Sequence, residues 1–245
     1  MRDLNREFED NQFRQYAYDF DYRMHGFMMR TFEPHLPEGR AGELGCYHGA
    51  FTENLMAKYT DLTVVEGASD LIEIARTRVG SRVTFVNSMF EKFEPSQPFD
   101  AAFLMHTLEH LDNPVAVLNR IGSWLTPTGK FFIAVPNAYA ASRQIAVGMG
   151  LIEQPTAVTE GEFLHGHRRT YSMDALKEHI DAAGLVIEEE GGVLFKPLAN
   201  FQFDACLHAK IVDDAFLEGC FAMGKDYPAL CASIYVVCKR NEKKS

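Results

Sequence analysis

Residues 41–52 read AGELGCYHGAFT, and this stretch decides the fold. Glu43 ends a short apolar run, and two glycines, Gly45 and Gly49, come just before a segment with a helical pattern. Gly45 allows the backbone to turn tightly and to approach a ligand, and Gly49 allows the following helix to pack closely. Tyr47 stands where such turns usually carry a further glycine. The stretch alone therefore permits either a ligand-binding turn or an ordinary corner between a strand and a helix.

The segments around this turn alternate regularly in type. Short apolar runs, AGELG, TVVE, VTFVN, FDAAFLM and KFFIAVPN, are separated by helical patterns at about 51–59, 70–79 and 114–125. This alternation predicts repeated βαβ units and a doubly wound α/β fold with a parallel sheet. SMDALKEHIDAAGL adds a helix with Ser172 as its N-cap and Gly184 as its stop, and VIEEEGG and ASIYVVCKR supply two further strands.

The chain divides into four segments of one domain. Aromatic and Met residues at helical spacings predict an N-terminal helical cover over residues 1–39, which ends at the proline-containing EPHLPEGR. The alternating segment, 40–192, forms the core, and 193–230, rich in Phe, Ala and Cys, is predicted to be an inserted cap or lid. The last strand and a short tail occupy 231–245.

Composition limits the partners and the compartment. The 245 residues are 47% hydrophobic and 24% charged, which suits a single well-packed domain. Five cysteines without a CxxC pair argue against a disulfide framework or a zinc ribbon and predict a reducing cytoplasm. A charged start and no apolar run of about 18 residues predict neither export nor membrane contact. The net charge of −10 argues against nucleic acid, so we expect a small-molecule partner and, through the apolar cap, a possible homodimer.

An acidic side chain at the end of the second strand strengthens the ligand-binding interpretation. In open parallel sheets, ligands lie at the carboxyl ends of strands, and the first strand-to-helix turn is the usual place. Glu66 follows TVV at that edge, as Glu43 does on the first strand. A carboxylate there can accept hydrogen bonds from both hydroxyls of an adenosine ribose. The turn and Glu66 together therefore predict a nucleoside-binding site.

Four segments of the chain resemble a known family. ELGCYHGAFT, VVEGASDLIEIAR, FDAAFLMHTLEHLDNP and LTPTGKFFIAVPN are similar to successive signature segments of the class I S-adenosylmethionine-dependent methyltransferases of small-molecule type. The likeness covers roughly 40–137, and GHRRTYSMDALKEHIDAAGL extends it toward the C-terminus. It implies a Rossmann-like, seven-stranded, mostly parallel sheet whose last strand is antiparallel. It also implies S-adenosyl-L-methionine as cofactor.

The resemblance implies a set of cofactor-binding residues. The glycine turn would hold the methionine portion of the cofactor, Glu66 its ribose, and the ends of the third and fourth strands its base and sulfonium. The expected residues are Glu43, Gly45, Cys46, Tyr47, Gly49, Glu66, Gly67, Ser88, Met89, Phe90, Met105, His106 and, from the N-terminal cover, Tyr16. Two positions depart from the family: Tyr47 replaces a glycine, and Met89 stands where many members carry an aspartate. We therefore expect adenine to be recognised by backbone groups, by the Ser88 hydroxyl or by packing against Met89 and Phe90.

The motif HTLEH, residues 106–110, permits a second chemistry. His106, Glu109 and His110 form H-x-x-E-H, the inverted zinc-peptidase pattern, which needs both histidines on one long helix. Here the motif directly follows a strand, and the next helix starts only after Asn113-Pro114. The context therefore argues against a metallopeptidase, which stays behind the other functions as an alternative. A metal site from His106, Glu109, His110 and one of the later histidines has no fixed geometry in the sequence, so we expect no metal. Instead, the strand end directs His106 toward the ligand.

The loop FLHGHRRTYS, residues 163–172, supplies further polar candidates. Methyl transfer is an in-line displacement, so an enzyme aligns the acceptor while a base of near-neutral pKa removes its proton. His167, His165 and His106 are the candidate bases, in that order. An arginine could hold an anionic group of the acceptor. The expected substrate-binding residues are Tyr18, Arg23, Arg168, Tyr171, Lys196 and Asn200.

The predicted function is transfer of a methyl group from S-adenosylmethionine to nitrogen or oxygen of a small polar metabolite. The alternative is a cofactor-binding partner subunit without transfer activity, in which Tyr47 and Met89 record a lost function. A dehydrogenase shares the first half of the pattern, but the chain offers no obvious acid for hydride transfer.

Overall fold

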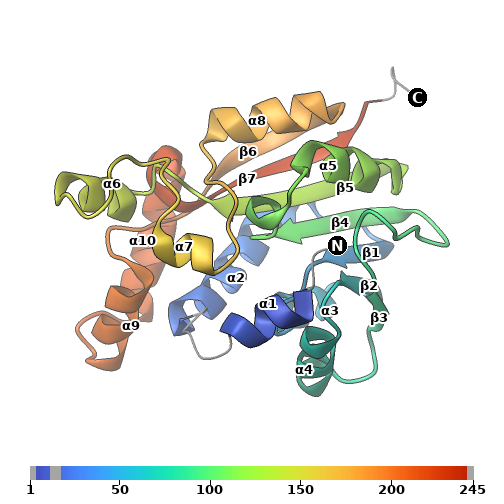
Figure 1. Ribbon diagram of the computed structural model, residues 1–245, viewed down its shortest axis with the longest axis horizontal. Coiled ribbons are helices and arrows are strands. Elements are labelled where there is room, and N and C mark those ends of the chain that lie inside the picture. The colour runs from blue at the N-terminus through green and yellow to red at the C-terminus, as the bar shows by residue number, and fades with distance from the viewer. Residues whose placement is uncertain (1–3, 12–17, 242–245) are drawn as a thin grey trace.

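The structure, a computed structural model, describes residues 4–11 and 18–241 and is built around one sheet of seven strands (Figure 1). The strands are β1 (Arg40–Leu44), β2 (Asp61–Glu66), β3 (Thr84–Asn87), β4 (Phe99–Met105), β5 (Leu125–Pro136), β6 (Leu185–Phe195) and β7 (Cys231–Arg240). Their order is β3-β2-β1-β4-β5-β7-β6, and β7 is antiparallel to both of its neighbours. The other pairs are parallel. This confirms the doubly wound, mostly parallel sheet with an antiparallel last strand.

The centre of the sheet is apolar on both faces. In β4, Ala101, Ala102, Phe103 and Leu104 are all fully buried. A parallel strand covered by helices on both sides needs such a continuous apolar run, because neither face meets water. This is why FDAAFLM does not alternate between polar and apolar residues.

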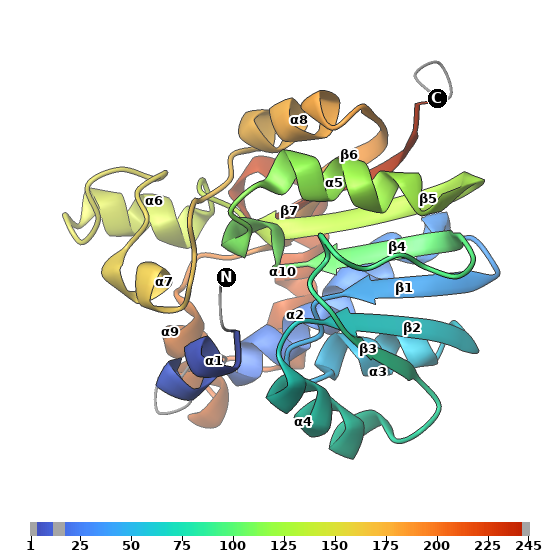
Figure 2. The same ribbon diagram turned by 45° about the vertical axis from the view of Figure 1, so that its right-hand side comes forward.

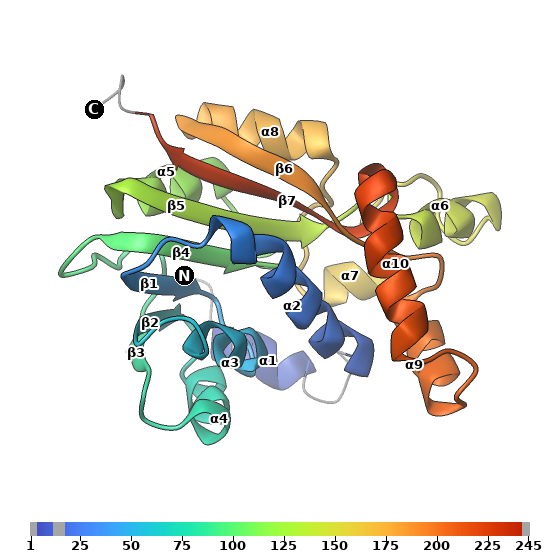
Figure 3. The ribbon, with the colours of Figure 1, turned by 180° about the vertical axis from the view of Figure 1, so that it is seen from behind.

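Helices cover both faces of the sheet. One face carries α2 (Asp19–Phe32), α3 (Ala50–Met56), α4 (Ser69–Val79) and α10 (Asp214–Asp226), as Figure 3 shows from behind. The other carries α5 (Pro114–Ser123) and α8 (Met173–Ala182). On the first face the rings of Phe103 and Phe132 stack with centroids 4.7 Å apart. On the second, Ser172 Oγ accepts a hydrogen bond from Ala175 N at 3.1 Å, which confirms the predicted N-cap of α8.

The remaining helices lie beyond the carboxyl ends of the parallel strands (Figure 2). They are α1 (Leu4–Asn11), α6 (Ala141–Gly148), α7 (Glu160–Leu164) and α9 (Asn200–His208). Three short 3-10 helices connect other elements: η1 (Glu33–His35) precedes β1, η2 (Leu108–His110) follows β4, and η3 (Pro228–Leu230) precedes β7. The segment 193–230 starts within β6 and continues as α9, α10 and η3. Asp204 of α9 accepts hydrogen bonds from the backbone N–H groups of Asp19 and Phe20, which fixes α9 to the start of α2. Among the described residues, no helix is both long and apolar enough to cross a membrane.

Candidate active site

The turn between β1 and α3 keeps its tight shape although it lacks one glycine. Gly45 and Gly49 have φ of 81° and 75°, and Tyr47 between them adopts φ of 47°. A left-handed conformation costs a residue with a Cβ about 1–2 kcal/mol. The Tyr47 ring stacks on His48 with centroids 3.7 Å apart, so aromatic packing accompanies this strain. Tyr47 therefore replaces a glycine without opening the turn.

Close neighbours leave no room for a side chain at either glycine. A Cβ on Gly45 would lie 2.9 Å from Thr107 Oγ1, and one on Gly49 would lie 3.0 Å from Ala75 Cβ. Both distances are below ordinary van der Waals contact. The turn is therefore held between the end of β4 and the helix α4.

We expect Gly45→Ala to destabilise the fold and to weaken cofactor binding. The positive φ alone costs about 1–2 kcal/mol of unfolding free energy, and Thr107 must also move. Gly26→Ala is the matched control, because Gly26 lies in α2 with no heavy atom within 4 Å of the added Cβ, and helical Gly→Ala gains about 0.5–1 kcal/mol. Urea unfolding of both variants measures the difference. Equal stabilities would contradict this account of the turn.

Two buried carboxylates lie beneath the turn and play different parts. Glu66 Oε2 accepts from Cys46 N at 3.1 Å and Oε1 from Ala68 N at 2.9 Å. Burial raises the pKa of Glu66, and these backbone N–H groups oppose that rise. Glu43 instead accepts from Thr52 Oγ1 at 2.6 Å, and burial raises its pKa to about 8. Glu43 therefore braces α3 against β1, while Glu66 braces the turn through the backbone N–H groups of Cys46 and Ala68.

An apolar corner lies beside Glu66. Gly67 stands so close to α1 that an added Cβ would lie 2.5 Å from Leu4 Cδ1 and 3.0 Å from Met89 Sδ. Ser88 Oγ donates to Met89 O at 3.0 Å, and Phe90 is buried. The corner is therefore apolar, as packing against adenine by Met89 and Phe90 would require. Leu4 was missed from the sequence, because nothing in a short N-terminal helix indicates which loop it covers.

His106 is fixed at the end of β4. Its Nε2 lies 2.8 Å from Ser233 Oγ, and its backbone adopts φ of 45°. Burial lowers the pKa of His106 to about 3, and the neighbouring His25, His167 and Lys196 add to the effect. Non-glycine residues in the left-handed region are concentrated at functional sites. His106 is therefore a neutral, oriented imidazole next to other polar groups.

A half-buried chain of polar side chains extends from the end of β6 to α2. Lys196 Nζ donates to Asn200 Oδ1 at 2.6 Å, and Asn200 Nδ2 donates to Asp21 Oδ1 at 2.7 Å. Tyr18 N donates to Asp21 Oδ2 at 2.9 Å. Burial lowers the pKa of Lys196 to about 8 and raises that of Asp21. The structure thus brings Tyr18, Lys196 and Asn200 together, and it adds Asp21, which the sequence analysis missed.

The loop after α7 is joined to the end of β4. Arg168 N donates to Glu109 O at 2.9 Å, and the rings of His167 and His110 lie 4.6 Å apart. Burial lowers the pKa of His167 to about 4. Glu162 of α7 pairs with Arg143 at 2.6 Å, and the sequence analysis missed both.

Three side chains that were expected to bind substrate have partners elsewhere in the structure. Arg23 pairs with Asp214 of α10 at the surface. The Arg168 side chain pairs with Asp112 at 3.2 Å. Tyr171 is fully buried beneath α8, and its hydroxyl lies 3.1 Å from His179 Nδ1. Tyr16 lies outside the described residues.

The H-x-x-E-H motif does not form a peptidase site. Glu109 and His110 belong to the three-residue helix η2, and His106 precedes it with its Nε2 turned to Ser233. The two histidines of the motif therefore do not share the long helix that such a site requires.

Comparisons with known proteins agree on one family. Residues 6–190 match a family model described as a methyltransferase domain. A ubiquinone biosynthesis O-methyltransferase from Xanthomonas euvesicatoria is 27% identical over 67% of this chain and 70% of its own. Two solved structures share the fold. The N-methyltransferase NodS from Bradyrhizobium japonicum, in complex with S-adenosylhomocysteine, has a TM-score of 0.60 and 16% identity, over 98% of this chain and 97% of its own. A possible histamine N-methyltransferase from Thermotoga maritima has a TM-score of 0.63 and 18% identity, over 98% of this chain and 100% of its own.

The residues present fit the cofactor of this family. The turn presents no Cβ at Gly45 and Gly49, and Glu66 offers a buried carboxylate beside it. The apolar side chains of Leu4 and Met89 pack at Gly67, next to that carboxylate. The chain therefore belongs to the methyltransferase-domain family and is a class I methyltransferase that uses S-adenosylmethionine.

Proposed function

We propose that this enzyme methylates an oxygen of a small polar acceptor held between His106 and Lys196. When bound, S-adenosylmethionine supplies an activated methyl group on its sulfonium. The observation that carries the proposal is His106, which lies on left-handed backbone at the end of β4 with its Nε2 2.8 Å from Ser233 Oγ. A base fixed at this strand end meets the geometric requirement of an in-line displacement.

His106 is the preferred base among the three candidate histidines. If Nε2–H donates to Ser233 Oγ, Nδ1 keeps a lone pair that can accept the proton of a hydroxyl. His167 faces Glu109 and His110 instead, and His165 follows the end of α7. The order inferred from the sequence, with His167 first, is therefore reversed in our proposal.

The polar chain around Lys196 supports an acceptor with an anionic group. Lys196 donates to the neutral Asn200, and Asn200 in turn donates to Asp21. An ammonium group has three N–H donors, so Lys196 can also donate to a carboxylate or a phenolate of the acceptor. The ubiquinone biosynthesis relative is an O-methyltransferase, which favours oxygen over nitrogen. The N-methyltransferase structures support the fold only.

We expect Lys196→Gln to raise KM for an anionic acceptor without changing affinity for S-adenosylhomocysteine. A hydrogen bond to a charged group contributes about 1.5–3 kcal/mol, so the rise is about 10–100-fold. Formation of S-adenosylhomocysteine from S-adenosylmethionine, in the presence of dihydroxybenzoates or of small aliphatic amines, measures both acceptor class and KM. Turnover of amines alone would contradict an oxygen acceptor. Cofactor binding without turnover of any hydroxylated acceptor would favour the non-transferring partner subunit.

A further inference from the structure

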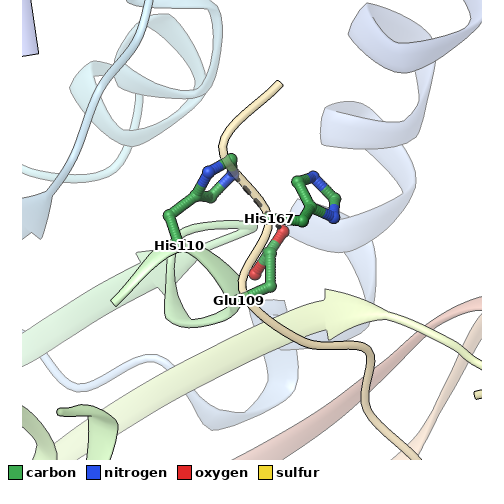
Figure 4. Close-up of side chains that lie close together, drawn as sticks. All are labelled: Glu109, His110 and His167. Carbon is green, nitrogen blue, oxygen red and sulfur yellow. Dashed lines mark ion pairs between the residues drawn. The ribbon is translucent and has the colours of Figure 1, made fainter. Parts of the chain in front are cut away.

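A cluster of metal-ligating side chains lies at the junction of η2 and the loop after α7 (Figure 4). We propose that Glu109, His110 and His167 bind one divalent transition-metal ion, with Zn²⁺ as the best match. Their ligand atoms all lie within 4.8 Å of one another. The inference goes beyond methyl transfer, because the site does not depend on which acceptor is methylated.

The Glu109 carboxylate is the observation that points to a ligand. Glu109 is 1% exposed, and neither Oε1 nor Oε2 has a hydrogen-bond partner among the described residues. A buried ionised carboxylate is strongly unfavourable unless it is paired, hydrogen-bonded or bound to a metal. Glu109 also directs its carboxylate toward two imidazoles, as Figure 4 shows. A bound cation would satisfy both oxygens.

The arginines around Glu109 have other partners or directions. Arg143 binds Glu162 at 2.6 Å, and Arg168 binds Asp112 at 3.2 Å. Arg169 lines the same small cavity as Glu109, and its Nη2 donates to Asp112 O at 3.3 Å. Within the described part of the chain, no ion pair joins Arg169 to Glu109 at 4.0 Å or less. Because Arg169 Nη1 has no partner there, Arg169 is the one competitor of a metal ion for this carboxylate.

The backbone holds the three ligands near the required spacing. Glu109 Oε1 lies 4.0 Å from His110 Nε2, and the bond from Arg168 N to Glu109 O fixes His167 beside them. Tetrahedral zinc with ligand bonds of about 2.0–2.2 Å places its ligand atoms about 3.3–3.6 Å apart. Small side-chain rotations on a fixed backbone therefore close the site.

The ligand types select the class of ion. Two imidazoles and one carboxylate are a set that zinc uses with three protein ligands and one open position. Magnesium and calcium prefer oxygen ligands alone. Glu109 and His167 also line a small cavity together with Asn137 and Thr170. His106 does not belong to the set, because its Nε2 is directed to Ser233.

Titration calorimetry of the EDTA-treated full chain with Zn²⁺ tests the site, and visible absorption of Co²⁺ reports its coordination. We expect one ion per chain. Glu109→Gln and His167→Ala should each weaken binding by more than about 100-fold, because even residues outside the ligand shell alter affinity about 10–100-fold. His165→Ala, in the same loop but outside the cluster, is the matched control and should bind like the wild type.

Three results would overturn the proposal. The first is no Zn²⁺ binding by the wild type, or equal loss in His165→Ala. The second is Mg²⁺ binding at the expense of Zn²⁺. The third is a lower melting temperature of Arg169→Gln than of the wild type, by the same amount with and without Zn²⁺. That result would make Arg169 the partner of Glu109. Glu109→Gln keeps the shape of the side chain, and its melting temperature without Zn²⁺ shows whether the fold is intact.

Discussion

We expect His106→Asn to lower kcat by about 10²-fold, the lower end of the contribution of a positioned general base, because burial lowers the pKa of His106 to about 3 and so weakens it as a base. Asparagine tolerates the left-handed conformation that His106 adopts, with φ of 45°. It cannot accept the proton of an acceptor hydroxyl at neutral pH. The substitution therefore removes the base while it keeps the backbone conformation.

The matched control for this variant is Ser233→Ala, which leaves the imidazole but removes its hydrogen-bond partner. We expect a smaller loss of kcat, because the ring is less well oriented but still basic. Affinity for S-adenosylhomocysteine should be nearly unchanged in both variants. Full turnover of His106→Asn would place the base elsewhere, with His165 as the next candidate.

The pH profile provides an independent check on His106. Burial lowers its pKa to about 3, so the ring is already neutral and competent at pH 5 and stays so at higher pH. The active form is lost only as pH falls toward 3. The wild-type kcat should therefore show no inflection near the ordinary histidine pKa of about 6.5. An inflection there that disappears in His106→Asn would contradict the low pKa.

We expect Glu66→Ala to weaken binding of S-adenosylhomocysteine by at least about 100-fold. Two hydrogen bonds to a charged carboxylate contribute about 1.5–3 kcal/mol each, and the turn also loses the acceptor of Cys46 N. Glu66→Gln keeps the shape and one acceptor oxygen, so its loss should be smaller. Titration calorimetry measures both affinities.

Glu43→Gln is the control for Glu66. Glu43 is equally buried, but its carboxylate is bonded to Thr52 on the helix side of β1. We expect this variant to change cofactor affinity less than Glu66→Gln does. Equal losses, or unchanged binding in Glu66→Ala with an unchanged melting temperature, would show that the ribose site lies elsewhere.

The local pattern of the chain is sufficient for the frame of the fold. Five apolar runs became β1 to β5, and Ser172 caps α8, because strand length, apolar continuity and capping are properties of neighbouring residues. The positions of Gly45 and Gly49 in the turn follow from the same kind of signal. They need left-handed backbone, which the residue type itself indicates.

Contacts between distant segments could not be predicted in this way. His106 meets Ser233 because β7 pairs with β5 in a register that matches Pro136 with Ser233, and no local pattern fixes that register. Asp21 reaches Asn200 only because α9 docks on the start of α2. Tyr171 was expected to touch substrate, but its ring packs beneath α8, since a polar sequence neighbourhood does not determine side-chain direction.

The most direct test of the central claim is a crystal structure of the protein with S-adenosylhomocysteine. The account predicts ribose hydroxyls on the Glu66 carboxylate, the methionine portion over the turn at Gly45, and the sulfur next to His106. The adenine should lie in the corner at Gly67 and Met89. A ligand bound with its ribose away from Glu66, or with its sulfur distant from His106, would contradict the account.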